Sequence, residues 1–263
     1  MKSKIKKICT VCLQILLPLL IAFFVRAGMI LLLYRLFDKW NLCTDTLSIA
    51  PSWMRSLWLN AAYIANIAAI VFGLTATVFI NRKHNCSGGI ALKAATAGFL
   101  YAVIPLALFV AVDSVRFYRF SLDLSILTYF LLPAFAALIL RGSIQLLGLK
   151  CIWGYVLSAL LQLGLAFMLQ GYNILLLVNS ALFGVCACFL LYKTATPFTE
   201  AVFSAVFGLV SRGLLGFPDA GIYPVSEDII TGGNYGLEAS AFTTLIFIVF
   251  LFLCRKEVFK VGR

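Results

Sequence analysis

The chain has 263 residues, of which 63% are hydrophobic and 12% are charged, and its formal net charge is +11. A soluble domain carries about 25% charged residues and could not bury this much apolar surface, so the composition excludes an ordinary soluble fold. The apolar runs have helical length, and the alternating ten-residue segments of a membrane β-barrel are absent. The positive charge is attributed to residues that flank membrane spans, and nucleic acid is not expected as a partner.

Eight membrane spans are predicted when about 20 apolar residues are required for each. In chain order they cover residues 10–36, 56–80, 90–112, 122–147, 151–169, 172–192, 198–216 and 238–254. The N-terminal MKSKIKK followed by apolar residues resembles a signal peptide, but the apolar stretch is too long and is interpreted as an uncleaved first span. The predicted fold is an all-α, polytopic membrane helix bundle with about eight transmembrane helices, forming a single domain over residues 1–263.

Basic residues in the loops indicate the orientation of these spans. If the N-terminus is cytoplasmic, the cytoplasmic segments hold Lys2, Lys4, Lys6, Lys7, Arg82, Lys83, Lys93, Lys150, Lys193, Arg255, Lys256, Lys260 and Arg263. The outer loops then hold chiefly Lys39, Arg55, Arg116 and Arg119, together with most of the acidic residues. This asymmetry follows the positive-inside rule. It predicts a multi-pass protein of the cell membrane with both termini in the cytoplasm and the 217–237 loop outside.

Charged groups within spans are the first candidates for function, because burying them in lipid is costly. Four residues qualify, namely Arg26, Arg141, Glu200 and Arg212. Arg26 is expected either to snorkel or to pair within the bundle, and Glu200 is expected in the headgroup layer beside Lys193. Gln145, Gln162 and Asn179 are expected to join helices through hydrogen bonds. The single histidine and the eight cysteines form no metal-site or disulfide pattern, so neither a metal nor a cofactor is expected.

The C-terminal half resembles a known family of intramembrane proteases. The segment RGLLGFPDAG at 212–221, followed by ITGGNYGLEAS at 230–240, is similar to the region after the last catalytic helix of the CPBP family, the CAAX protease and bacteriocin-processing family. The segment NSALFG at 179–184 with Tyr192-Lys-Thr, and Leu140-Arg-Gly142, resemble earlier motifs in the same order. The similarity covers about residues 125–254, and the glycine-rich TGGxYGLEAS stretch is its most specific part.

The resemblance implies the family's fold and argues against its activity. The family uses two adjacent glutamates with an arginine four residues after the second, a histidine on the next span, and a later His-x-x-x-Asn/Asp. Here the glutamates match Ala136 and Ala137, and only the arginine remains, as Arg141. The first histidine falls near Ala166, and the later pair falls at or beside Ala205 and Leu209. An alanine can neither accept a proton nor orient a water molecule.

The sequence therefore predicts a catalytically inactive homologue that contacts the lipid bilayer and binds a membrane or secreted peptide or a protein partner, in bacteriocin immunity or processing or in envelope regulation. Arg141, Gln145, Asn179 and Glu200 are the candidate polar residues of a vestigial cavity. Arg141 is predicted to face the bundle interior and bind oxygens there, and the alternative places it near the cytoplasmic headgroups. Two other functions stay open. One is an active endopeptidase with a rearranged site, whose base would be Glu200, the only glutamate within a span besides the interfacial Glu238. The other is a small-solute transporter.

Overall fold

The computed structural model describes most of the chain. The described residues are 2–43, 46, 48–80, 88–113, 115–117, 125–149, 151–170, 172–214, 222–224 and 230–258. Within these ranges, only the backbone is described for residues 2–8, 117, 125, 141, 146, 151, 168–170, 212–214, 222–224, 233, 234 and 255–258. The side chain of Arg141, which carries one of the sequence-based predictions, therefore lies outside the described residues, and so does that of Arg212.

The described chain is almost entirely helical. Its elements are α1 (Lys2–Lys39), α2 (Ser52–Leu59), α3 (Ala61–Ile80), α4 (Gly88–Ala111), β1 (Val115–Phe117), α5 (Ser125–Leu147), α6 (Cys151–Gln170), α7 (Ile174–Thr194), α8 (Pro197–Gly208), the π-helix η1 (Leu209–Leu214), β2 (Ile222–Pro224), the 3-10 helix η2 (Gly233–Ala239) and α9 (Ala241–Val258). The predicted all-α membrane helix bundle is confirmed.

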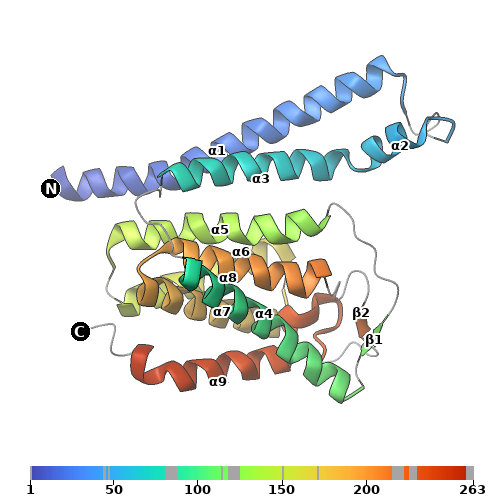
Figure 1. Cartoon of the computed structure of the whole chain (residues 1–263). Coiled ribbons are helices and arrows are strands. Elements are labelled where there is room, and N and C mark those ends of the chain that lie inside the picture. The colour runs from blue at the N-terminus through green and yellow to red at the C-terminus, as the bar shows by residue number, and fades with distance from the viewer. Residues whose placement is uncertain are drawn as a thin grey trace.

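The long helices run up and down the bundle in alternation (Figure 1), and the start of α1 and the end of α9 lie at the same end of it. By length and composition, α1, α3, α4, α5 and α7 are each long and apolar enough to cross a membrane. Shorter apolar helices occupy 152–167, 197–211 and 241–254. Short connections such as the one between α7 and α8 favour antiparallel neighbours, because two residues leave no room for a crossover. In that connection Thr196 caps α8, and Pro197 occupies its first turn.

The first helix is longer than the span predicted at 10–36, and the span predicted at 198–216 is divided between α8 and the π-helix η1. At two other predicted spans a polar side chain sets where the helix begins. The span predicted at 56–80 is interrupted at Asn60, whose side-chain amide donates a hydrogen bond to the Ser56 carbonyl at 2.8 Å, so the long helix begins only at Ala61. The span predicted to begin at 238 begins instead at Ala241. The hydroxyl of Ser240 accepts a hydrogen bond from the Phe242 amide at 3.1 Å and separates α9 from the preceding 3-10 helix.

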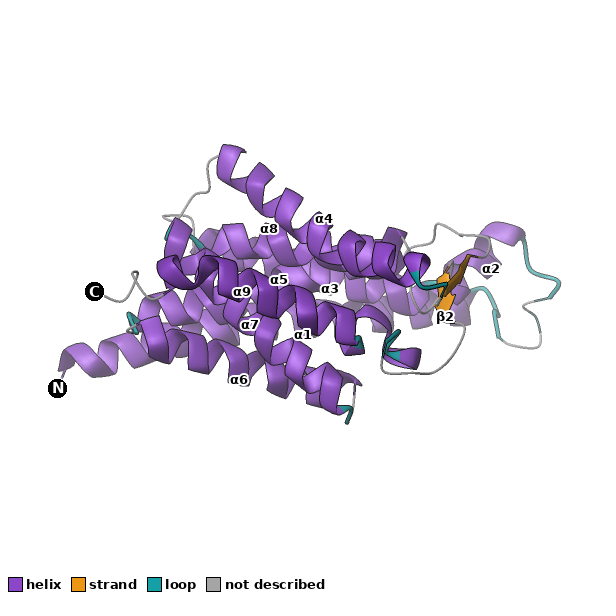
Figure 2. Ribbon diagram, turned by 90° about the horizontal axis from the view of Figure 1, so that it is seen from below, coloured by secondary structure: helices purple, strands orange, loops and turns teal. Residues whose placement is uncertain are grey.

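A short antiparallel strand pair, absent from the sequence-based prediction, joins two distant loops. Strand β1 follows α4 and β2 follows the π-helix, and Arg116 lies opposite Tyr223 in the register. Figure 2 shows this pair at the end of the bundle away from both termini. The loop after α4 and the loop after α8 therefore lie on the same side, as an up-and-down arrangement requires.

Close helix contacts bring α4, α5 and α8 together. A side chain at Gly208 of α8 would place its Cβ 2.5 Å from the Tyr129 carbonyl oxygen and 2.9 Å from Pro133 Cγ, both on α5. A Cβ at Gly98 of α4 would likewise lie 2.5 Å from the Phe203 carbonyl oxygen of α8. Small residues at such positions are typical of membrane helix interfaces, because they let two backbones approach.

The first hairpin packs beside α5. Arg26 of α1 donates a hydrogen bond from Nε to Asn66 Oδ1 of α3 at 2.8 Å. Of the two arrangements expected for Arg26, the structure thus shows pairing within the bundle. Ile70 of α3 contacts Phe135 and Ile139 of α5 in a buried apolar cluster.

Candidate functional site

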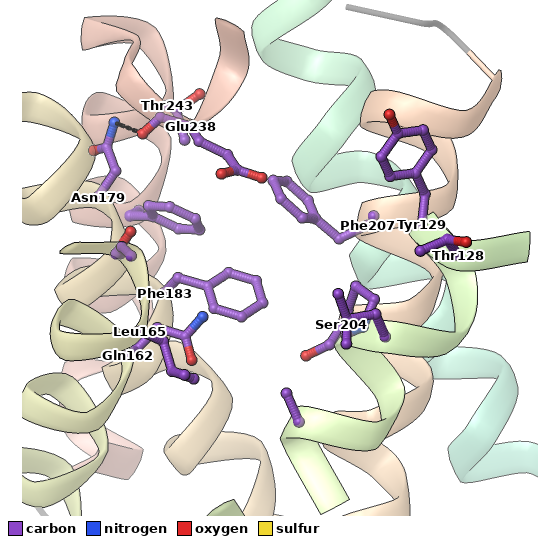
Figure 3. Close-up of a pocket in the computed structure, with 17 residues that line it drawn as sticks. Thr128, Tyr129, Gln162, Leu165, Asn179, Phe183, Ser204, Phe207, Glu238 and Thr243 are labelled. Carbon is purple, nitrogen blue, oxygen red and sulfur yellow. Dashed lines mark hydrogen bonds between the residues drawn. The ribbon is translucent and has the colours of Figure 1, made fainter. Parts of the chain in front are cut away.

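A cavity of about 380 Å³ is lined on one side by the first half of α5 and the second half of α8. These parts of α5 and α8 lie toward the end of the bundle away from the start of α1 (Figure 1). Figure 3 shows α5 and α8 on one side of it and α6 and α7 on the other, with the η2–α9 junction closing one end. This volume falls within the lower part of the range for small-ligand sites in proteins, about 300–1,000 Å³. The cavity can therefore hold a few amino-acid side chains or a compact ligand.

The lining is mainly apolar but carries several hydrogen-bonding groups. The polar lining residues are Thr128, Tyr129, Gln162, Asn179, Ser180, Ser204, Glu238 and Thr243. Apolar walls come from Leu132, Pro133, Leu165, Phe183, Phe207 and Phe247. Leu132 lines the cavity and is 43% exposed, which indicates an opening beside α5 toward the lipid-facing surface.

The positions that match the family's catalytic residues divide into two groups. Ala136 and Ala166 both line the cavity. Ala137 and Ala205 do not line it and belong instead to a buried apolar cluster between α5 and α8. On α8, Ser204 and Gly208 face the cavity, four residues apart and one position before the matched pair Ala205 and Leu209. Leu209 itself begins the π-helix.

Asn179 lines the cavity, as predicted for a candidate polar residue, but its hydrogen bonds hold the fold together. Its Nδ2 donates to the carbonyl oxygens of Glu238 at 3.0 Å and Ser240 at 2.9 Å, and its Oδ1 accepts from the Thr244 hydroxyl at 2.6 Å. The prediction that Asn179 joins helices is therefore confirmed. Its effect is to fix the η2–α9 junction, and with it the backbone that carries Glu238 (Figure 3).

Gln145 and Glu200, the other described candidates for the cavity, lie elsewhere. Gln145 donates from Nε2 to the Ala195 carbonyl at 2.8 Å and so ties the end of α5 to the end of α7. Glu200 occupies the first turn of α8 and is only 1% exposed, so its side chain is buried among protein groups. A carboxylate in that turn is stabilised by the positive end of the helix dipole. Neither residue belongs to the cavity lining.

The sequence-based reasoning missed Glu238 as a cavity residue. Glu238 lies in the η2 turn, where Gly232 and Gly236 adopt positive φ angles of 76° and 59° that other residues rarely adopt. The Ser240 hydroxyl donates to the Ile230 carbonyl at 2.6 Å and closes this turn. The glycine-rich stretch could have indicated this position from the sequence. Closely spaced glycines favour a tight turn, because glycine adopts positive φ angles readily, and such a turn can direct a side chain into the bundle.

The sequence also gave no indication of two buried hydroxyls. Ser204 and Thr243 are 3% and 1% exposed, they line the cavity from α8 and α9, and their hydroxyl oxygens have no hydrogen-bond partner among the described residues. A buried hydroxyl left without a partner costs about 1–3 kcal/mol. At a cavity wall, both hydroxyls can bond to a polar group that enters the cavity.

Compared with protein-family models, with curated proteins and with solved structures, the chain gives no match. Function is therefore inferred from the cavity and from the residues that line it. Among the residues that the structure describes, no three His, Cys, Asp or Glu side chains gather where they could hold a metal ion. The lining offers hydroxyl groups, one carboxylate and an aromatic wall, which together suit binding of an amphipathic molecule.

Proposed function

We propose that this protein is a non-catalytic relative of the CPBP intramembrane proteases, and that it binds an apolar peptide segment in the cavity. The observation that carries the proposal is the position of Ala136 and Ala166. These residues were matched to a catalytic glutamate and a catalytic histidine from sequence alone, and they lie on different helices yet line the same cavity. The positions matched to the later motif, Ala205 and Leu209, do not line the cavity, and Ser204 and Gly208 line it instead, one position before each of them.

The lining supports a peptide as the occupant. Leucine and phenylalanine side chains suit apolar peptide side chains, and the hydroxyls of Ser204 and Thr243 suit the amide groups of a peptide backbone. The exposed face of Leu132 offers an entry for a segment that is already in the lipid.

The orientation of the protein is part of the same proposal. Both termini share one end of the bundle, and α1 begins there with four lysines within residues 2–7. Under the positive-inside rule that end is cytoplasmic and the protein belongs to the cell membrane. The cavity then lies in the outer half of the bilayer, where a secreted peptide or the outer part of a membrane peptide can reach it.

One observation favours a second candidate, the active endopeptidase. Glu238 is a carboxylate at the cavity and could act as a general base, whereas Glu200, the first residue considered for that role, lies outside the lining. A family-type site would also need a partner for this base at the positions of Ala136 and Ala166. Removal of one acid–base partner lowers rates by about 10²–10⁴-fold, so a site without them is expected to be inactive.

The test is direct peptide binding to the full-length protein in lipid nanodiscs of phosphatidylcholine and phosphatidylglycerol. The probe is a hexapeptide of leucine and phenylalanine with a free N-terminus and a fluorophore at its C-terminus. We expect saturable binding that is lost in Ala136→Phe, because the ring would fill the cavity. Ala107→Phe, at an exposed position on α4, should bind as the wild type does.

Two results would count against the proposal. Equal binding by the wild type and Ala136→Phe would show that the cavity is not the binding site. Mass spectrometry of the same mixtures would detect cleavage, and cleavage that disappears in Glu238→Gln would establish the endopeptidase instead.

A further inference from the structure

Gln162 places a carboxamide at the wall of the cavity. The residue lies in the second half of α6 and lines the cavity. It was expected to join helices, but it has no hydrogen bond to any other residue that the structure describes. In Figure 3 its amide points into the cavity, toward the wall that α5 and α8 form. A carboxamide carries two N–H donors and an acceptor oxygen, so in apolar surroundings it needs a polar partner.

Ser204 lies on the opposite wall. Its hydroxyl points from α8 into the cavity, toward the side from which Gln162 comes (Figure 3). Ser204 is 3% exposed, and its Oγ has no hydrogen-bond partner among the described residues. Phe183 and Phe207 supply apolar surface beside these two groups. Opposite walls of the cavity therefore carry hydrogen-bonding groups that face each other across an apolar space.

An extended peptide has hydrogen-bonding groups on both of its edges. The N–H and C=O of one residue point to one side, and those of the next residue point to the other side. A carboxamide can accept from that N–H and donate to that C=O together, as one residue does for another in a hydrogen-bonded strand pair. A hydroxyl can bind either group of the neighbouring residue. A helical segment offers neither group, because it uses them internally.

We propose that Gln162 recognises the main chain of the peptide ligand by binding the N–H and C=O of one extended residue. Ser204 binds a main-chain group of the neighbouring residue from the opposite wall, and the apolar side chains of the ligand lie against Phe183 and Phe207. Gln162 thereby selects an amide chain over an ester chain of the same shape. This inference rests on the proposed peptide-binding function and adds which group of the ligand is recognised, and by which side chain.

The experiment compares the labelled hexapeptide with an analogue in which an ester oxygen replaces each N–H between its six residues. This exchange removes the main-chain donors in every register and adds no bulk. Phosphatidylcholine and phosphatidylglycerol contain no amide, so the lipid of the nanodiscs cannot supply the recognised group. The wild type should bind the hexapeptide more tightly than the ester analogue.

The decisive variant is Gln162→Met, because methionine keeps the length of the side chain and removes the amide. Its preference for the hexapeptide over the ester analogue should be about 5- to 100-fold smaller than that of the wild type, the range for leaving buried hydrogen-bonding groups unpaired. Comparing the two preferences cancels the different partition of the two ligands into lipid. Gln162→Met breaks no hydrogen bond between described residues, and thermal unfolding checks that it is folded.

Two further variants accompany it. Gln145→Met makes the same exchange outside the cavity lining and should keep the preference of the wild type. Ser204→Ala removes one hydrogen bond on the opposite wall and should lower the preference by about 2- to 10-fold. Ser204→Ala also carries the test if Gln162→Met does not fold.

The outcomes separate this inference from the peptide-binding proposal. If wild type and Gln162→Met show the same preference while Ala136→Phe abolishes binding of both ligands, peptide binding stands and main-chain recognition by Gln162 is wrong. An equal loss of preference in Gln145→Met would also overturn the inference, because the exchange would then act through the fold. If neither ligand binds the wild type, the peptide-binding function itself fails.

Discussion

The buried hydroxyl of Thr243 allows a stringent test of the cavity, because replacing threonine with valine exchanges one hydroxyl for a methyl group of nearly the same size. Thr243 is 1% exposed, and its Oγ1 has no hydrogen-bond partner among the described residues. Valine would remove an unsatisfied polar group that costs about 1–3 kcal/mol. We therefore expect Thr243→Val to stabilise the unliganded protein by about 1–3 kcal/mol.

The matched control is Thr77→Val on α3. Thr77 is 0% exposed, but its Oγ1 donates to the Gly73 carbonyl at 2.8 Å. Valine there would lose a hydrogen bond worth about 1 kcal/mol and bury a methyl group worth about 0.8 kcal/mol, so the two effects nearly cancel. The two variants should thus differ by about 1–3 kcal/mol although each makes the same chemical change.

Thermal unfolding of the purified variants in detergent measures this difference. For a chain of this size, 1 kcal/mol corresponds to about 2–4 °C in Tm. Thr243→Val should unfold at a higher temperature than the wild type and should also bind the free hexapeptide less tightly, because the hydroxyl is placed for the ligand. A Tm for Thr243→Val at or below that of Thr77→Val would refute the view that this hydroxyl awaits a ligand.

Two further predictions concern helix packing and orientation. Gly208→Ala should lower stability by about 1–3 kcal/mol, because its Cβ would overlap α5. Gly164→Ala on α6, where a Cβ would meet nothing within 4 Å, should raise stability by about 0.5–1 kcal/mol in the same unfolding assay. A variant that keeps only Cys43, an exposed cysteine between α1 and α2, should react with an impermeant maleimide on intact cells. Reaction only after the cells are opened would reverse the proposed orientation.

Much of the architecture follows from the sequence because it depends on local composition. Long apolar runs indicate helices wherever they occur, and the alternation of eight such runs places both termini at one end. The predicted boundaries were less accurate where a single polar residue decides the local structure. Asn60 ends α2 through a hydrogen bond to the preceding turn of that helix, and the Ser240 hydroxyl caps the start of α9. Such bonds depend on side-chain geometry, which average hydrophobicity does not contain.

The cavity depended on tertiary structure, as neighbouring alanines show. Ala136 and Ala137 are adjacent and identical in composition, yet they point about 100° apart on a helix with 3.6 residues per turn. One lines the cavity and the other packs against α8. Glu200 and Glu238 present the same contrast, since both are glutamates near helix ends and only Glu238 lines the cavity. The sequence by itself determined a membrane bundle and the positions of its long helices, because hydrophobicity along the chain is a local property. Only the tertiary structure decided which faces meet in the cavity, because that depends on the rotation and register of helices far apart in the chain.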